Sequence, residues 1–219
     1  MSKAIIVADF AYKGPKRTGR GTGHQGLRNL LGYLQYRDRV QNQLAKQPDY
    51  ERWQDHGLGV HWREIFQQCD ELQSKHVLAW TWVISPAPDL MALVPEDQRR
   101  DLVCDLTERV VEEYYEQRGF DTPPYSYILH DRQTNEAGRQ QLHTHVILPG
   151  MAPLPGVDMA PVYNNKERGD DVLFREIAAQ NFSEALDKII GPEWRHMREQ
   201  ELERTPDTDD LDVWFPRER

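Results

Sequence analysis

The chain has 219 residues, 38% of them hydrophobic, which is enough to bury the core of one globular domain. Its two cysteines, Cys69 and Cys104, provide neither a disulfide framework nor a cysteine metal site, and such sparse usage is typical of the reducing cytoplasm. No apolar run is long enough for a signal peptide or a membrane span, so we expect a cytoplasmic protein without a membrane partner.

The net charge of −9 is unevenly distributed along the chain. Residues 1–40 contain eight lysines or arginines and two aspartates, whereas residues 196–219 are rich in aspartate and glutamate. We therefore expect a folded domain over residues 1–195, followed by an acidic and flexible tail.

The first elements are a strand, a basic loop and a helix. Residues 4–10 predict a buried strand, and residues 13–23, with four glycines, predict a flexible loop. This loop is either an ordinary solvated segment or a contact for a phosphate backbone, and its basic side chains are Lys13, Lys16, Arg17 and Arg20.

The helix predicted over residues 26–37 has a narrow apolar stripe formed by Leu27, Leu30, Leu31 and Leu34. At roughly 100° per residue, Tyr33 lies on the flank of this stripe and Tyr36 lies nearly opposite to it. Arg37 follows Tyr33 by one turn. Tyr33 can therefore leave the core and reach a neighbouring cleft, with an arginine close by.

The middle of the chain alternates helices with strands. Residues 41–57 are polar and irregular, residues 60–72 predict a second helix, and residues 76–85 predict a central strand because both of its faces are apolar. A long helix follows between Pro95 and Gly119.

Three histidines lie on the next two predicted strands, residues 125–131 and 142–148. Side chains alternate between the faces of a strand, so His143 and His145 share a face, and a hairpin through the polar connection brings His130 beside them. Three neutral imidazoles leave an open position on a bound cation, as catalytic metal sites do. Asp131 faces away from His130 on a regular strand, and a surface carboxylate is the simpler interpretation of it.

The last elements complete a recognisable order. A short strand at residues 160–163 precedes a helix over residues 172–190, which Gly191 and Pro192 terminate. Consecutive strands joined by a hairpin, with long helices between the others, predict an α+β fold with a mainly antiparallel central sheet and helices packed on it.

These parts support phosphate chemistry. A cation held by the three histidines can bind a phosphate oxygen and stabilise the charge that develops during attack. A tyrosine can become covalently linked to that phosphate, and the resulting ester can be reversed by a free 3′-hydroxyl. Such a pair would nick and rejoin a strand without ATP.

Several short motifs in this order resemble the relaxase or mobilisation-nuclease branch of the HUH endonucleases, over roughly residues 4–190. The motifs are Asn29-Leu30-Leu31-Gly32-Tyr33-Leu34, Trp82-Val83-Ile84-Ser85-Pro86, a strand ending in His130-Asp131, and Leu142-His143-Thr144-His145-Val146-Ile147. Each motif is short, so it is their order along the chain that makes the match specific.

The resemblance implies a metal-dependent nickase that acts at one site and on one strand of DNA to start the transfer of a plasmid or an integrative element. Tyr33 would form a 5′-phosphotyrosine, the three histidines would hold Mg²⁺ or Mn²⁺, and Arg37 or the basic loop would position single-stranded or locally melted DNA at an origin of transfer. The short acidic tail and the overall acidity depart from the family pattern, and they imply an accessory DNA-binding protein.

Two alternatives remain open. A rolling-circle replication initiator places its nucleophile after the histidine pair, and Tyr163 with Lys166 matches its spacing, although the surrounding turn residues suit the required helix poorly. A non-catalytic metal-binding or DNA-binding module, including a cupin, is the other; a cupin would have many more short strands and fewer long helices.

Overall fold

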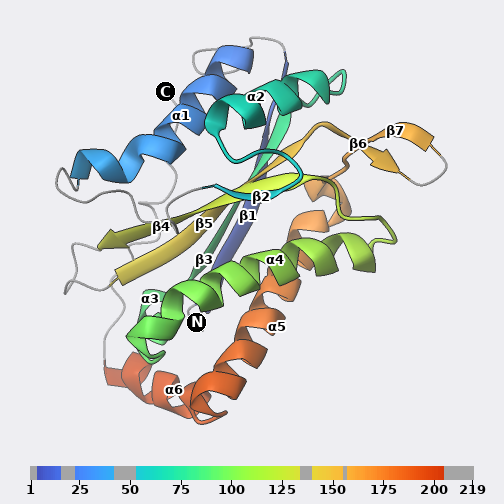
Figure 1. The fold of residues 1–219 in the computed structure, drawn as a ribbon. Helices are drawn as coiled ribbons and strands as arrows, with labels where there is room; N and C mark the ends of the chain where they lie inside the picture. The colour runs from blue at the N-terminus through green and yellow to red at the C-terminus, as the bar shows by residue number, and fades with distance from the viewer. Residues whose placement is uncertain (1–3, 16–22, 42–52, 134–139, 155–156, 205–219) are drawn as a thin grey trace.

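Figure 1 shows the computed structural model, which describes residues 4–15, 23–41, 53–133, 140–154 and 157–204. In chain order the elements are β1 (Ile6–Lys13), α1 (Gly23–Gln41), β2 (Gln54–His56), α2 (Trp62–Glu71), β3 (Ala79–Pro86), α3 (Pro88–Met91), the 3₁₀ turn η2 (Glu96–Gln98), α4 (Arg99–Gln117), β4 (Tyr125–Gln133), β5 (Gln140–Pro149), β6 (Met151–Leu154), β7 (Val157–Pro161), η3 (Lys166–Arg168), α5 (Asp170–Ile190) and α6 (Trp194–Arg204). None of the helices in these ranges combines the length and apolar character needed to cross a membrane.

The centre of the fold is a five-stranded sheet in the order β1-β3-β5-β4-β2, in which every neighbouring pair is antiparallel. Helices α1 and α2 lie on one face of this sheet, and α4 and α5 lie on the other (Figure 1). β6 and β7 form a separate two-stranded sheet beside it. The expected α+β fold with a mainly antiparallel sheet is therefore confirmed.

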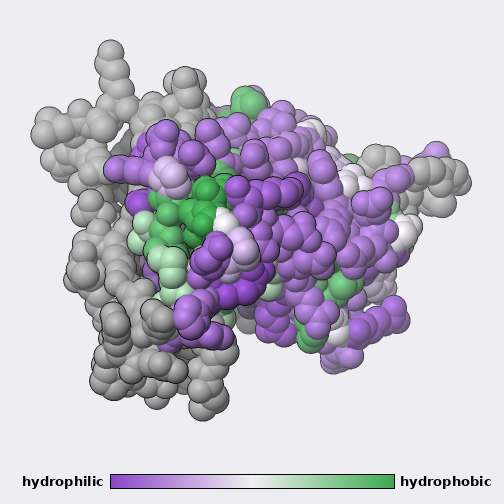
Figure 2. All heavy atoms as spheres, turned by 90° about the horizontal axis from the view of Figure 1, so that it is seen from below, coloured by the Kyte–Doolittle hydropathy of each residue, from purple (hydrophilic) through white to green (hydrophobic). Residues whose placement is uncertain are grey.

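Each face of the sheet buries its own apolar cluster, because side chains alternate along the strands. The larger cluster lies under α4 and α5, where the Trp82 ring packs against Phe174 at 4.7 Å and Tyr114 at 5.2 Å. The smaller cluster lies under α1 and α2 and includes Ile128 and Ile147. Figure 2 shows the molecule from below: the coloured surface is mostly hydrophilic, with one larger hydrophobic area and several smaller hydrophobic spots.

The first helix has the predicted phase but a greater length. Leu27 and Leu31 are 0% exposed and Leu34 is 2% exposed, so the leucine stripe faces the smaller cluster. The helix spans 19 residues, from Gly23 to Gln41, and so extends beyond the leucine stripe at both ends. The stripe therefore predicted the buried side correctly and the ends incorrectly.

Two segments differ from the sequence expectation. The polar region expected to be irregular contains the edge strand β2, which pairs with β4 from Gln54 opposite Tyr127 to His56 opposite Tyr125. The single strand expected at residues 160–163 is instead the end of a hairpin, in which Met151 lies opposite Pro161. Both segments are short, so their pairing depends on a neighbouring strand more than on their own composition.

The C-terminal helix α6 begins before the expected tail and continues to Arg204. It is attached to the domain by Arg198, which donates to the Asp89 carboxylate at 3.1 Å and to the Ala4 carbonyl at 2.8 Å. Residues 205–219, which hold much of the acidic sequence, lie outside the described residues. The division into a domain and a tail at residue 195 stays a prediction.

Candidate metal centre and nucleophile helix

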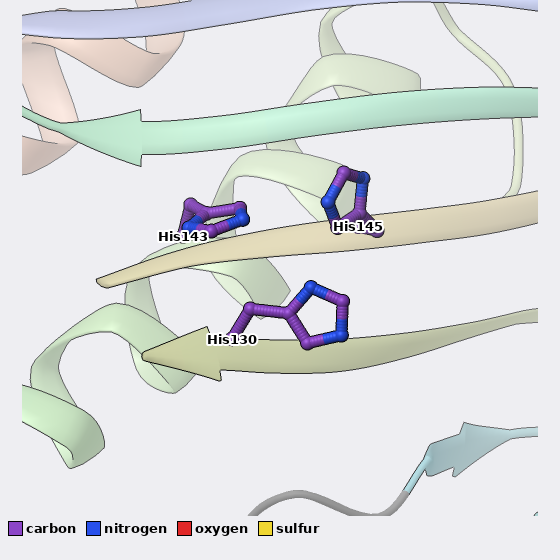
Figure 3. A group of neighbouring side chains, drawn as sticks. All are labelled: His130, His143 and His145. Atoms are coloured by element: carbon purple, nitrogen blue, oxygen red, sulfur yellow. The ribbon is translucent and has the colours of Figure 1, made fainter. Parts of the chain in front are cut away.

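The three histidines lie together on the α1 side of the sheet. In the antiparallel pairing of β4 with β5, His130 lies directly opposite His143, and Ile128 lies opposite His145. The three ring centroids are separated by 5.1, 5.2 and 5.5 Å, and one nitrogen from each ring lies within 4.8 Å of the other two (Figure 3). One cation can therefore contact all three imidazoles.

Main-chain carbonyls select the nitrogen that two of these rings offer to a metal. Nε2 of His130 lies 2.8 Å from the carbonyl oxygen of Leu34, and Nδ1 of His143 lies 3.3 Å from the carbonyl oxygen of Gln141. A carbonyl oxygen only accepts hydrogen bonds, so each of these nitrogens carries the proton. The ligand atoms are then Nδ1 of His130 and Nε2 of His143.

The burial of the cluster suits a catalytic site. His130 and His143 are each 2% exposed, whereas His145 is partly exposed, so the cluster meets solvent at His145. Three neutral imidazoles provide a strong site for a divalent cation and leave coordination positions for other ligands. The donor set therefore fits a metal that acts as a Lewis acid.

Thr144 and Asp131, which neighbour the histidines in the sequence, point to the opposite face of the sheet, where α4 lies. Thr144 lies between the two histidines of β5, and its hydroxyl is 2.7 Å from that of Thr107 in α4. Asp131 accepts a hydrogen bond from Arg100 of α4 at 3.2 Å. The strand stays regular, so Asp131 lies apart from the imidazoles that it follows in the sequence.

We expect Asp131→Asn to leave Mn²⁺ affinity within about twofold of the parent, because the substitution weakens a partly exposed ion pair with Arg100 that is worth roughly 1 kcal/mol or less. Titration calorimetry would test this, with His130→Ala as the variant that removes a candidate ligand. A large loss of metal affinity in Asp131→Asn would show that the carboxylate acts on the site through the strand.

Four tyrosines are unsuited to act as nucleophiles. Burial raises the pKa of Tyr114, Tyr115, Tyr125 and Tyr127 above the usual value for a phenol. All four belong to the larger cluster, on the face opposite the histidines. Their phenolates are therefore disfavoured, and they are separated from the metal site by the sheet.

The exposed tyrosines divide between the two faces. Tyr12 packs against the Trp80 ring at 5.5 Å, and Trp80 belongs to the larger cluster. Tyr163 lies outside any helix and lines a shallow pocket with Tyr115 and Phe120 of the α4 side. Among the described tyrosines, Tyr33 and Tyr36 are the two in the helical layer that covers the histidines.

Tyr33 and Tyr36 are both accessible on α1. Tyr33 is 54% exposed and Tyr36 is 37% exposed, so exposure alone does not select between them. Gln35 marks the side of α1 that faces α2, because its side chain accepts a hydrogen bond from the Trp62 amide at 2.8 Å. Tyr33 precedes Gln35 by two positions, or about 200° around the helix, and so faces away from α2.

The basic residues proposed to bind DNA are mostly outside the described part of the chain. This applies to Lys16, Arg17 and Arg20, and to the side chain of Arg37. Lys13 is described at the end of β1, where its carbonyl oxygen accepts a hydrogen bond from the Leu78 amide at 2.7 Å. The DNA-binding role of these residues stays a prediction.

The cysteines do not provide thiolate ligands. Burial raises the pKa of the Cys69 thiol well above its usual value, and burial raises the pKa of the Cys104 thiol to about 11. Both remain protonated at neutral pH and do not compete with the imidazoles for a cation.

The sequence did not predict the contacts of the Leu34 and Gln141 carbonyls with the histidines. Every residue has a carbonyl, and only the folded geometry selects these two.

No family model matches this sequence, and no curated protein matches it. The fold does match solved structures of the conjugative relaxase TrwC with oriT DNA. The metal-bound complex has a TM-score of 0.56 and 12% identity, and the match covers 94% of this chain and 87% of that one. The complex with a 27-mer DNA comprising the recognition hairpin and the cleavage site has a TM-score of 0.55 and 12% identity, and the match covers 94% of this chain and 86% of that one. The metal-free complex has a TM-score of 0.53 and 15% identity, and the match covers 83% of this chain and 70% of that one. The expected relaxase-like fold is confirmed by these matches.

Proposed function

We propose that this protein is a metal-dependent DNA relaxase that nicks and rejoins one strand at a specific site, and so initiates the transfer of a plasmid or an integrative element. The observation that carries this proposal is the three-histidine cluster that lies beneath a tyrosine-bearing helix in a relaxase-type fold. The TrwC structures contain oriT DNA, so we infer that the substrate is single-stranded or locally melted DNA at an origin of transfer.

The cation would be Mn²⁺ or Mg²⁺, held by His130, His143 and His145. Of these two ions, Mn²⁺ accepts imidazole ligands more readily, because Mg²⁺ prefers oxygen ligands and gives up its waters reluctantly. When bound, the cation supplies Lewis acidity toward a non-bridging oxygen of the scissile phosphate.

Tyr33 would supply the covalent step. Its phenolic oxygen forms a bond to phosphorus while the bond from phosphorus to the 3′-oxygen breaks, and the departing 3′-oxygen takes up a proton to balance the one that leaves the phenol. The resulting 5′-phosphotyrosine keeps the energy of the phosphodiester. Attack by a 3′-hydroxyl reverses the step and rejoins the strand.

The basic loop would hold the DNA backbone before the strand reaches Tyr33. Neutralising Lys13, Lys16, Arg17 and Arg20 is expected to lower affinity similarly for all DNA sequences and to reduce the salt dependence of binding, by a slope of about one for each phosphate that is no longer paired with a cationic side chain. Binding isotherms at several salt concentrations would measure the slope. A slope equal to that of the parent would identify the loop as a solvated segment.

The alternatives predict different covalent products. A replication initiator would use Tyr163, which lies on the α4 side of the sheet and outside any helix. A non-catalytic module would form no covalent product. The test is incubation with single-stranded oligonucleotides from the element's own intergenic DNA, with Mn²⁺ or with a chelator. A metal-dependent protein–DNA adduct supports the relaxase proposal, and no adduct with any oligonucleotide contradicts it.

A further inference from the structure

A hydrogen bond joins α1, the helix that carries Tyr33, to the three-histidine cluster. The carbonyl oxygen of Leu34 in α1 accepts a hydrogen bond from Nε2 of His130 at 2.8 Å, and the two residues are 96 positions apart in the chain. His130 is 2% exposed, and the leucine side chain of the same α1 residue is also 2% exposed. A hydrogen bond in such surroundings is shielded from competing water and fixes the orientation of the ring.

We propose that the Leu34 carbonyl is a positioning group. Through its hydrogen bond with His130, it links metal binding to the position on the sheet of the α1 turn that carries Tyr33. The inference rests on the proposed function only in the role it gives to Tyr33. His130 would bind the cation through Nδ1, because Nε2 is held by the carbonyl. Coordination at Nδ1 would withdraw electron density from the ring and would make the Nε2–H group a stronger donor toward the Leu34 carbonyl.

The linkage works in both directions. If the bound cation strengthens the hydrogen bond between His130 and Leu34 by some factor, then formation of that hydrogen bond must raise metal affinity by the same factor. Tyr33 is the residue next to Leu34 in α1, so a shift of this helical turn would also move Tyr33. The cation would therefore orient the tyrosine as well as the phosphate.

Two leucines of the same buried stripe allow a matched test. Leu34 is 2% exposed and Leu27 is 0% exposed, so alanine at either position removes a buried side chain from α1. Leu27 lies seven residues away, about 10 Å along the helix. Titration calorimetry with Mn²⁺ alone, at a temperature where both variants are folded, would compare their metal affinities.

We expect Leu34→Ala to weaken Mn²⁺ binding by about fivefold or more, the usual lower range for coupled sites, and Leu27→Ala to change it by less than about twofold. Equal reductions in the two variants, or no reduction in Leu34→Ala, would overturn the proposal. Hydrogen exchange of the parent gives a readout that needs no α1 variant: Mn²⁺ should protect the α1 amides that follow Leu34, and this protection should vanish in His145→Ala. Unchanged exchange in the parent would also overturn it.

Nitrogen NMR of histidine-labelled protein tests the ligand atom directly, with ¹¹³Cd²⁺ as the probe. Coupling to cadmium is expected at Nδ1 of His130 and at Nε2 of His143, and coupling at Nε2 of His130 would refute the assignment. These measurements are made without DNA, so they test the inference separately from the proposed function. If the protein binds metal as described but forms no DNA adduct, the inference holds and the proposed function fails. If it forms the adduct but does not show the expected metal binding, the proposed function holds and the inference fails.

Discussion

Replacing any one of His130, His143 and His145 with alanine is expected to abolish Mn²⁺ binding and adduct formation together. Each ring provides one of three ligand atoms within 4.8 Å of one another. Removing a partner that only orients a ligand costs about 10–100-fold in metal affinity, so removing a ligand should cost more than about 100-fold. Titration calorimetry would measure the metal affinity, and denaturing gels that resolve the covalent adduct would measure its formation.

Exposed His76 provides the matched control, since its replacement removes an imidazole without touching the cluster. His76→Ala should bind Mn²⁺ and form adduct as the parent does. Circular dichroism should show that every variant is folded, because the two apolar clusters stabilise the sheet without help from the three histidines. Parent-like Mn²⁺ titrations in all three ligand variants would refute the metal site.

Tyr33→Phe is expected to bind DNA within about twofold of the parent and to reduce adduct formation by at least about 10³-fold, as removal of a covalent nucleophile does. The substitution removes one hydroxyl from a side chain that is 54% exposed, so the fold should not change. Gels would quantify the adduct, and peptide mapping of trapped parent adduct would identify the modified tyrosine.

Tyr36→Phe and Tyr163→Phe serve as controls for this experiment, and both should remain active. An adduct that maps to Tyr36 would move the nucleophile by three residues on the same helix. An adduct that maps to Tyr163 would favour the replication-initiator alternative, and it would require DNA to reach the α4 side of the sheet.

The parts of the site that the sequence predicted depend on local periodicity. The alternation of side chains along a strand places His143 and His145 on one face and turns Asp131 away from His130, and each outcome is decided within a single strand. The leucine stripe likewise predicted which side of α1 is buried. These features need no knowledge of distant parts of the chain.

The parts that the sequence did not predict depend on contacts between distant segments. β2 has three residues and is polar, so it becomes a strand only because β4 offers it an edge. Arg198 contacts Asp89 and the Ala4 carbonyl, two groups that are more than 100 positions away in the sequence. The Leu34 carbonyl has no side-chain signature at all, so its contact with His130 requires the folded structure.

The hairpin of β4 and β5 also has a consequence for how the protein assembles. All three histidines of the candidate metal site come from two strands that are adjacent in sequence and in space, whereas α1 reaches them across a much longer stretch of chain. Contacts of small sequence separation form early and at low entropic cost, and distant ones form later. The strand pairing that brings the three histidines together should therefore form before α1 docks on the sheet, so the proposed metal site would be assembled ahead of the proposed nucleophile.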